Sequence, residues 1–97
     1  MSQIAVRTRT LVKICGLRSL PEARAALEAG ADLLGFIFWR SGKRYIGPSE
    51  AARIIHALRT ESAAFSAVGV FVDPLLGDVE AAAAECGLDY IQLSGDE

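Results

Sequence analysis

Residues 33–38 read LLGFIF, a run that is apolar at almost every position. A strand with one face in water alternates apolar and polar side chains, whereas a strand covered by helices on both faces is apolar throughout. The run therefore predicts a buried strand of a parallel sheet. Similar strands are predicted at residues 11–15 (LVKIC), 67–72 (AVGVFV) and 90–93 (YIQL).

The segments between these runs have helical patterns. Residues 19–22 (SLPE) form a capping box with proline in the first turn, and the helix that follows is expected to stop at Gly30. Pro48 stands at the first position of a second helix, whose apolar stripe is Ala51, Ile54, Ile55 and Leu58. A third helix is predicted over residues 76–86.

A weak internal repeat supports this division into units. Residues 28–34 (EAGADLL) resemble residues 85–91 (ECGLDYI), and each segment joins the end of a helix to the next strand. Strands that alternate with helices require right-handed crossovers and a parallel sheet. Two architectures satisfy this rule, an open doubly wound sheet and part of a closed barrel, and periodicity does not choose between them.

The composition is that of one folded domain over residues 1–97, which begins with a polar arm at residues 1–10. The chain is 52% hydrophobic and 23% charged, with a net charge of −2. That charge offers no basic field for nucleic acid or for an anionic membrane, so a small-molecule partner is expected. The amino terminus has no apolar signal region and no run of ~18 apolar residues follows, which predicts a cytoplasmic protein.

Two cysteines, Cys15 and Cys86, are far apart in the sequence. They form no C-x-x-C pair and no histidines cluster near them, so the sequence indicates neither a disulfide framework nor a metal site.

Ligands of parallel α/β sheets bind at the carboxyl ends of the strands. The residues that follow each apolar run are therefore the candidate site, and all of them include polar groups. They are Cys15-Gly16, the loop 39–45 (WRSGKRY), Asp73 and residues 94–97 (SGDE).

These same positions carry a resemblance to a known family. The blocks are residues 13–17 (KICGL), 29–32 (AGAD), 35–39 (GFIFW), 44–45 (RY), 68–72 (VGVFV), 92–93 (QL) and 95–97 (GDE). In order and spacing they resemble phosphoribosylanthranilate isomerase. The resemblance implies the amino-terminal half of a (β/α)8 barrel, with the units strand, helix, strand, helix, strand, helix, strand. It also implies an Amadori rearrangement of an aldosylamine phosphate to a 1-amino-1-deoxyketose phosphate in tryptophan biosynthesis, with no metal or organic cofactor.

By the same resemblance, Cys15 is the general base that removes the proton from ribose C2′. A thiol has an ordinary pKa near ~8.5, and nearby cations such as Arg44 favour its thiolate. From spacing alone the residue reads as a small buried side chain that ends a strand. The family motif favours the catalytic role instead.

Arg44 matches the family arginine that pairs with the anthranilate carboxylate, and the guanidinium fork suits a planar carboxylate. Read alone, it is a solvated loop charge, as Arg40 and Lys43 are expected to be. The chain has Gly42-Lys43 where the family often has serine-proline, so a more mobile loop is expected.

The remaining polar candidates are given structural roles. Ser94 replaces the family's usual histidine and is expected to bond locally. His56 falls beside the apolar stripe of its helix and is expected at the surface. Asp73 and Asp96 are interpreted as helix caps. Cys86 is expected to pack in the core.

The family's general acid and phosphate-binding loops belong to later strands, so this chain alone is expected to be inactive. Half a barrel leaves two strand edges and its inward face exposed. A complementary carboxyl-terminal half, a second copy or a continuation of the chain is therefore the expected partner. Two alternatives remain: a noncatalytic α/β binding module with an acidic pocket at Asp73 and Asp96, and another phosphosugar isomerase of the same fold. The binding module does not explain the basic loop around Arg44. Another phosphosugar isomerase does not explain the KICG motif.

Overall fold

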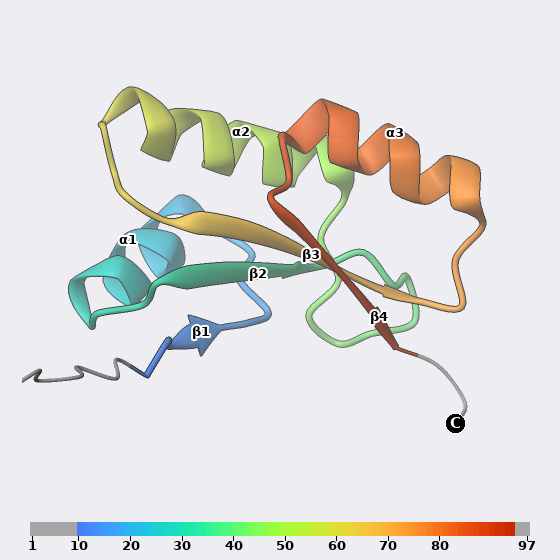
Figure 1. The fold of residues 1–97 in the computed structure, drawn as a ribbon, viewed down its shortest axis with the longest axis horizontal. Helices are drawn as coiled ribbons and strands as arrows, with labels where there is room; N and C mark the ends of the chain where they lie inside the picture. The colour runs from blue at the N-terminus through green and yellow to red at the C-terminus, as the bar shows by residue number, and fades with distance from the viewer. Residues whose placement is uncertain (1–9, 95–97) are drawn as a thin grey trace, which may run out of the picture.

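The computed structural model describes residues 10–94, which alternate strands and helices throughout (Figure 1). The elements are β1 (Lys13–Ile14), α1 (Leu20–Glu28), β2 (Leu33–Ile37), α2 (Pro48–Thr60), β3 (Ser66–Val72), α3 (Leu76–Cys86) and β4 (Tyr90–Ser94). The three predicted helices and the predicted strands at 33–38, 67–72 and 90–93 are thereby confirmed within these residues, and the first strand is present but shorter than predicted. No helix in this range is long and apolar enough to cross a membrane.

The order of the strands in the sheet decides the architecture that periodicity left open. In the part of the chain that the structure describes, the strands form one parallel sheet in the order β1-β2-β3-β4. Each strand lies beside the strand before it, so every right-handed crossover steps in the same direction and places its helix on the same face. This is the arrangement of a (β/α) barrel, because a doubly wound sheet reverses its strand order.

The core lies between that face of the sheet and the helices. Leu34 and Phe36 from β2 and Ala67 from β3 pack against buried residues of all three helices. The predicted stripe of α2 is buried along its whole length, with Ile55 and Leu58 at 0% and 1% exposure. Figure 1 shows α2 and α3 above the same side of the sheet. Burial of this apolar surface is the main source of stability, at about 25 cal/mol per Å².

The first predicted strand is wrong in its extent and its burial. A buried strand was expected over residues 11–15, but β1 has two residues, and Leu11 and Val12 are 65% and 44% exposed. The reason is position: within the described residues β1 is an edge of the sheet with β2 on one side. The same position explains β4, where Tyr90 and Leu93 are 58% and 64% exposed.

The amino-terminal starts of the helices agree with the local sequence signals in two cases of three. Ser19 Oγ accepts the amide N–H of Glu22 at the start of α1, as the capping box predicts. Pro48 begins α2 as expected. The cap predicted for Asp73 is wrong, because the residue before α3 is Leu75 and no side chain caps that helix.

Asp73 instead has a backbone role. Its φ is +43°, and its amide donates to the carbonyl of Ser94 at 3.1 Å. A residue held in this left-handed turn, two positions before the N-cap Leu75, cannot itself serve as the N-cap.

Candidate active site at the carboxyl ends of the strands

Cys15 directly follows β1 and is exposed, so the expectation of a buried side chain that spacing alone gave is wrong. Its sulfur lies over Gly35 of β2: a Cβ added to Gly35 would be 2.7 Å from Cys15 Sγ. Gly35 also fixes the backbone that follows, since its carbonyl accepts the amides of Gly16 and Leu17 at 3.0 and 3.2 Å. Gly35 therefore determines the position of the Cys15 thiol.

Arg44 comes from the β2–α2 loop and lies across the residue after this cysteine. Its Nε donates to the carbonyl of Gly16 at 2.8 Å. A Cβ on Gly16 would be 3.3 Å from both Cβ and Cγ of Arg44, so the stem of the arginine packs directly on the Gly16 backbone. Gly16 has a φ of +83°, which also favours glycine. The structure thus brings the two predicted site residues, Cys15 and Arg44, into one place.

Glu22 joins these two as a site residue that sequence reasoning used only as a helix cap. Its Oε2 accepts from Arg44 Nη2 at 3.1 Å, and its Oε1 accepts the amide of Arg18 at 2.8 Å. The hydrogen bond from the backbone amide of Arg18 lowers the pKa of the Glu22 carboxyl most, and the hydrogen bond and charge of Arg44 lower it further. The signal in the sequence was the SLPE box, which predicts the position of Glu22 but not its partner.

The β2–α2 loop that carries Arg44 is closed by backbone hydrogen bonds. Gly42 donates to the carbonyl of Trp39 at 2.9 Å, and Tyr45 donates to the carbonyl of Gly42 at 3.2 Å. Ile46 then donates to the carbonyl of Ile37 at 3.0 Å, which returns the chain to the end of β2. Gly42 takes part in two of these hydrogen bonds. The Gly42-Lys43 pair that stands in place of the family's serine-proline is therefore part of the loop's backbone turns.

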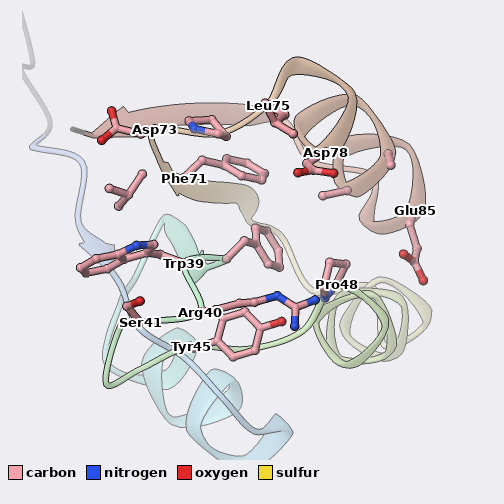
Figure 2. Close-up of a pocket in the computed structure, with 15 residues that line it drawn as sticks. Trp39, Arg40, Ser41, Tyr45, Pro48, Phe71, Asp73, Leu75, Asp78 and Glu85 are labelled. Atoms are coloured by element: carbon pink, nitrogen blue, oxygen red, sulfur yellow. The ribbon is translucent and has the colours of Figure 1, made fainter. Parts of the chain in front are cut away.

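A cavity of about 540 Å³ lies on the far side of this loop, between it and α3 (Figure 2). Phe71, Asp73 and Asp78 line it from one side, and Trp39 and Tyr45 from the other. Neither Cys15 nor Arg44 is among its lining residues. The cavity is therefore separate from the place where the predicted site residues meet.

A side-chain hydrogen bond also links the two outer strands of the described sheet. The register places Lys13 beside Leu33, Val70 beside Gln92, and Val72 beside Ser94. Lys13 Nζ donates to Gln92 Oε1, a hydrogen bond that joins the first strand to the fourth. Ser94 ends β4, and its carbonyl accepts the amide of Asp73 at 3.1 Å. This bond is made by the backbone, so a local hydrogen bond of the Ser94 side chain stays a prediction.

The other candidates lie elsewhere. His56 is exposed on α2, with Nε2 3.4 Å from the carbonyl of Glu85. Cys86 is fully buried, its thiol donates to the carbonyl of Pro48 at 3.2 Å, and burial raises its pKa to about 11, with a smaller effect from Glu85. Asp96 lies outside the described residues. Among residues 10–94, no group of three or more histidines, cysteines and carboxylates is arranged to hold a metal ion.

Known proteins resemble this chain over most of its length. Residues 12–97 match the family model described as N-(5'-phosphoribosyl)anthranilate (PRA) isomerase. A relative from Geobacter sp. (strain M21), named N-(5'-phosphoribosyl)anthranilate isomerase, is 51% identical over 88 residues, which are 91% of this chain and 42% of the relative.

Solved structures give the same result. Phosphoribosyl anthranilate isomerase from Thermotoga maritima superimposes with a TM-score of 0.84 at 38% identity, over 92% of this chain and 42% of that one. A second isomerase structure, in complex with reduced 1-(o-carboxyphenylamino)-1-deoxyribulose 5-phosphate, has the same TM-score and identity and covers 92% and 44%. The chain therefore spans less than half the length of the proteins it matches.

Proposed function

Because the chain belongs to the N-(5'-phosphoribosyl)anthranilate isomerase family, we propose that it supplies the base and the carboxylate-binding arginine of that isomerase. The observation that supports this most is the approach of Arg44 to Gly16, the residue next to Cys15. A base and a carboxylate-binding cation at the ends of neighbouring strands suit a substrate that joins an anthranilate to a phosphoribosyl group.

The proposed reaction begins when the ribose ring opens to a Schiff base between the anthranilate nitrogen and C1′. Cys15, as thiolate, removes the proton from C2′, and the C–H electron pair forms a C1′=C2′ double bond while the C=N pair moves to nitrogen. Protonation of C1′ and loss of the C2′ hydroxyl proton then give the ketone at C2′. One carbon is oxidised and its neighbour reduced, so no external oxidant takes part.

Arg44 would hold the anthranilate carboxylate during these steps. Its guanidinium has five N–H donors, and the bonds to Gly16 and Glu22 occupy Nε and one donor on Nη2. The donors that these two bonds leave are enough for a bidentate pair with a carboxylate. Fixing this end of the substrate places C2′ relative to the sulfur, and such orientation is a large part of catalysis.

The general acid and the phosphate-binding groups of this proposal lie outside the chain, as the family resemblance implies. General acid and general base each contribute roughly 10²–10⁴-fold, so residues 1–97 alone should show little turnover. The partner required is the remaining half of the barrel.

The test uses a completed barrel, in which residues 12–97 are joined to the carboxyl-terminal segment of the Geobacter relative that the match does not cover. Turnover of phosphoribosylanthranilate by this protein, with little or none by the chain alone, would support the proposal. A folded completed barrel that binds the substrate but does not isomerise it would refute the catalytic proposal and favour the noncatalytic binding module.

A further inference from the structure

Arg44 needs a second contact to define its position. Its side chain is 51% exposed and belongs to a loop outside the regular elements. A long side chain in such a place loses rotamer freedom when it is held in one conformation. The bond from Nε to the Gly16 carbonyl fixes one point of the guanidinium plane, which can still rotate about that point.

Glu22 supplies the second point, and its own position is fixed by the backbone. It lies in the first turn of α1, where its amide donates to Ser19 Oγ at 3.2 Å. Its Oε1 accepts the amide of Arg18 at 2.8 Å, which leaves Oε2 turned toward Arg44. The carboxylate is therefore held at the amide and at one oxygen, while the other oxygen holds the arginine.

One other ion pair shares this arrangement: Asp89 Oδ2 pairs with Arg59 at 3.1 Å and also accepts the amide of Ala67 at 2.8 Å. Two further pairs lack it. Arg24 pairs with Glu61, and Arg53 with Glu50, and among residues 10–94 no backbone amide donates to the side chain of either glutamate. Exposed pairs of that kind contribute little to stability, because both side chains lose entropy and the charges are screened. In the pair of Glu22 and Arg44, the carboxylate of Glu22 is already held by the amide of Arg18.

We infer that Glu22 is a positioning residue, which holds the guanidinium of Arg44 against Gly16 so that its remaining donors can receive the substrate carboxylate. This inference rests on the proposed function, in which Arg44 binds that carboxylate. It adds a residue of α1 to a site otherwise made by β1 and the β2–α2 loop. Ionised Glu22 and the ligand would then contact different donors of one guanidinium.

The test is Glu22→Gln in the completed barrel. Glutamine keeps an oxygen for the amide of Arg18 and keeps the helix cap, but it presents an uncharged amide to Arg44. We expect KM for phosphoribosylanthranilate to rise about three- to tenfold, as for other coupled charged pairs, with kcat nearly unchanged. KM for phosphoribosylaniline, which lacks the carboxylate, should not change. In an Arg44→Ala background the substitution should have no further effect.

Glu61→Gln is the matched control. It breaks an arginine–glutamate pair that also has one member in α1, and the exposures of the two pairs are alike, 50% and 44% against 51% and 41%. Glu61 follows α2 and lies away from the strand ends, so this variant should leave both KM values unchanged. A fall in KM for Glu22→Gln would show that Glu22 competes with the substrate, and equal KM changes for both substrates would show a structural role. Either result would overturn the inference.

A second measurement separates this inference from the proposed function. Hydrogen exchange of the Arg44 Nε proton, followed by NMR in the completed barrel, reports the bond to Gly16 whether or not the protein turns over substrate. We expect Glu22→Gln to speed this exchange at least several-fold while Glu61→Gln leaves it unchanged. Unchanged exchange in Glu22→Gln would refute the positioning role even if the wild-type barrel is an active isomerase.

Discussion

Gly35→Ala tests whether the place of Cys15 is set by the strand beside it. The new Cβ would be 2.7 Å from Sγ, 3.2 Å from Cβ and 3.1 Å from Cα of Cys15. Carbon atoms in favourable contact lie about 3.5–4.0 Å apart, so the sulfur must retreat by about 1 Å. A new rotamer of Cys15 moves Sγ and relieves that contact only, because Cβ and Cα do not move when the rotamer changes.

The expected cost has two parts. Overpacking of this size destabilises a fold by about 1–3 kcal/mol. A displacement of about 1 Å between a reacting group and its substrate lowers the rate by about 10²-fold. We therefore expect kcat of the completed barrel to fall by about two orders of magnitude, a change that the loss of stability alone does not produce once the protein is folded at the assay temperature.

Gly69→Ala is the control for overpacking. It crowds the opposite face of the same sheet, with its Cβ 2.5 Å from Leu88 Cδ1 and 3.0 Å from rings of Phe38 and Phe71. It should cost a similar amount of stability and leave kcat within about twofold, because no atom of Cys15 is among its near neighbours.

Gly77→Ala in α3 meets nothing within 4 Å and should stabilise the helix by about 1 kcal/mol.

The assay is kcat for phosphoribosylanthranilate beside the free energy of unfolding in urea for each variant. If Gly35→Ala and Gly69→Ala lose equal stability and both keep full kcat, the position of the Cys15 sulfur does not matter to turnover. That result would refute the reasoning from Gly35 and would weaken the assignment of Cys15 as the base.

Four further predictions use the same completed barrel or the chain alone. Cys15→Ser should lower kcat by at least about 10²-fold with little loss of folding, and unchanged turnover would exclude Cys15 as the base. Arg44→Ala should raise KM for phosphoribosylanthranilate much more than KM for phosphoribosylaniline; equal changes would make Arg44 a bystander. The pKa of Glu22 is lowered from 4.5, so its contribution to stability is present above that value and is lost as pH falls through the lowered pKa. Urea unfolding between about pH 6 and about pH 3 should therefore show a smaller loss in Glu22→Gln than in the wild type, and identical slopes would contradict this linkage. Residues 1–97 alone should associate or unfold without a cooperative transition, because Tyr90 and Leu93 on β4 are 58% and 64% exposed; sedimentation that shows a stable, active monomer would prove this wrong.

Sequence patterns predicted the elements where the determining interactions are local. The third helix was expected over residues 76–86 and occupies Leu76–Cys86, because Gly87 takes a left-handed conformation that ends it. Pro48 and the SLPE box mark the starts of the other two helices for equally local reasons. Such signals depend on one or two turns of chain and therefore need no partner distant in the sequence.

The errors arose where a partner distant in the sequence decides the outcome. Leu11 and Val12 have an apolar pattern, but their burial depends on what covers the sheet edge. Asp73 is a residue type that often caps helices, but its amide donates to the carbonyl of Ser94 in β4 and its φ is +43°. Glu22 was recognised as a cap and missed as a partner of Arg44, since 22 residues separate the two.

The position of the proposed base and arginine is set almost entirely within the first two βα units. Cys15 is held by the absence of a side chain at Gly35 and by the two amides that the Gly35 carbonyl accepts. Arg44 is held by Gly16 and Glu22, which lie before β2. None of these contacts involves β3 or β4, so in the folded barrel the later strands are not what holds these two groups relative to each other. The remaining strands would then supply the acid and the phosphate contacts to a half-site whose geometry already exists.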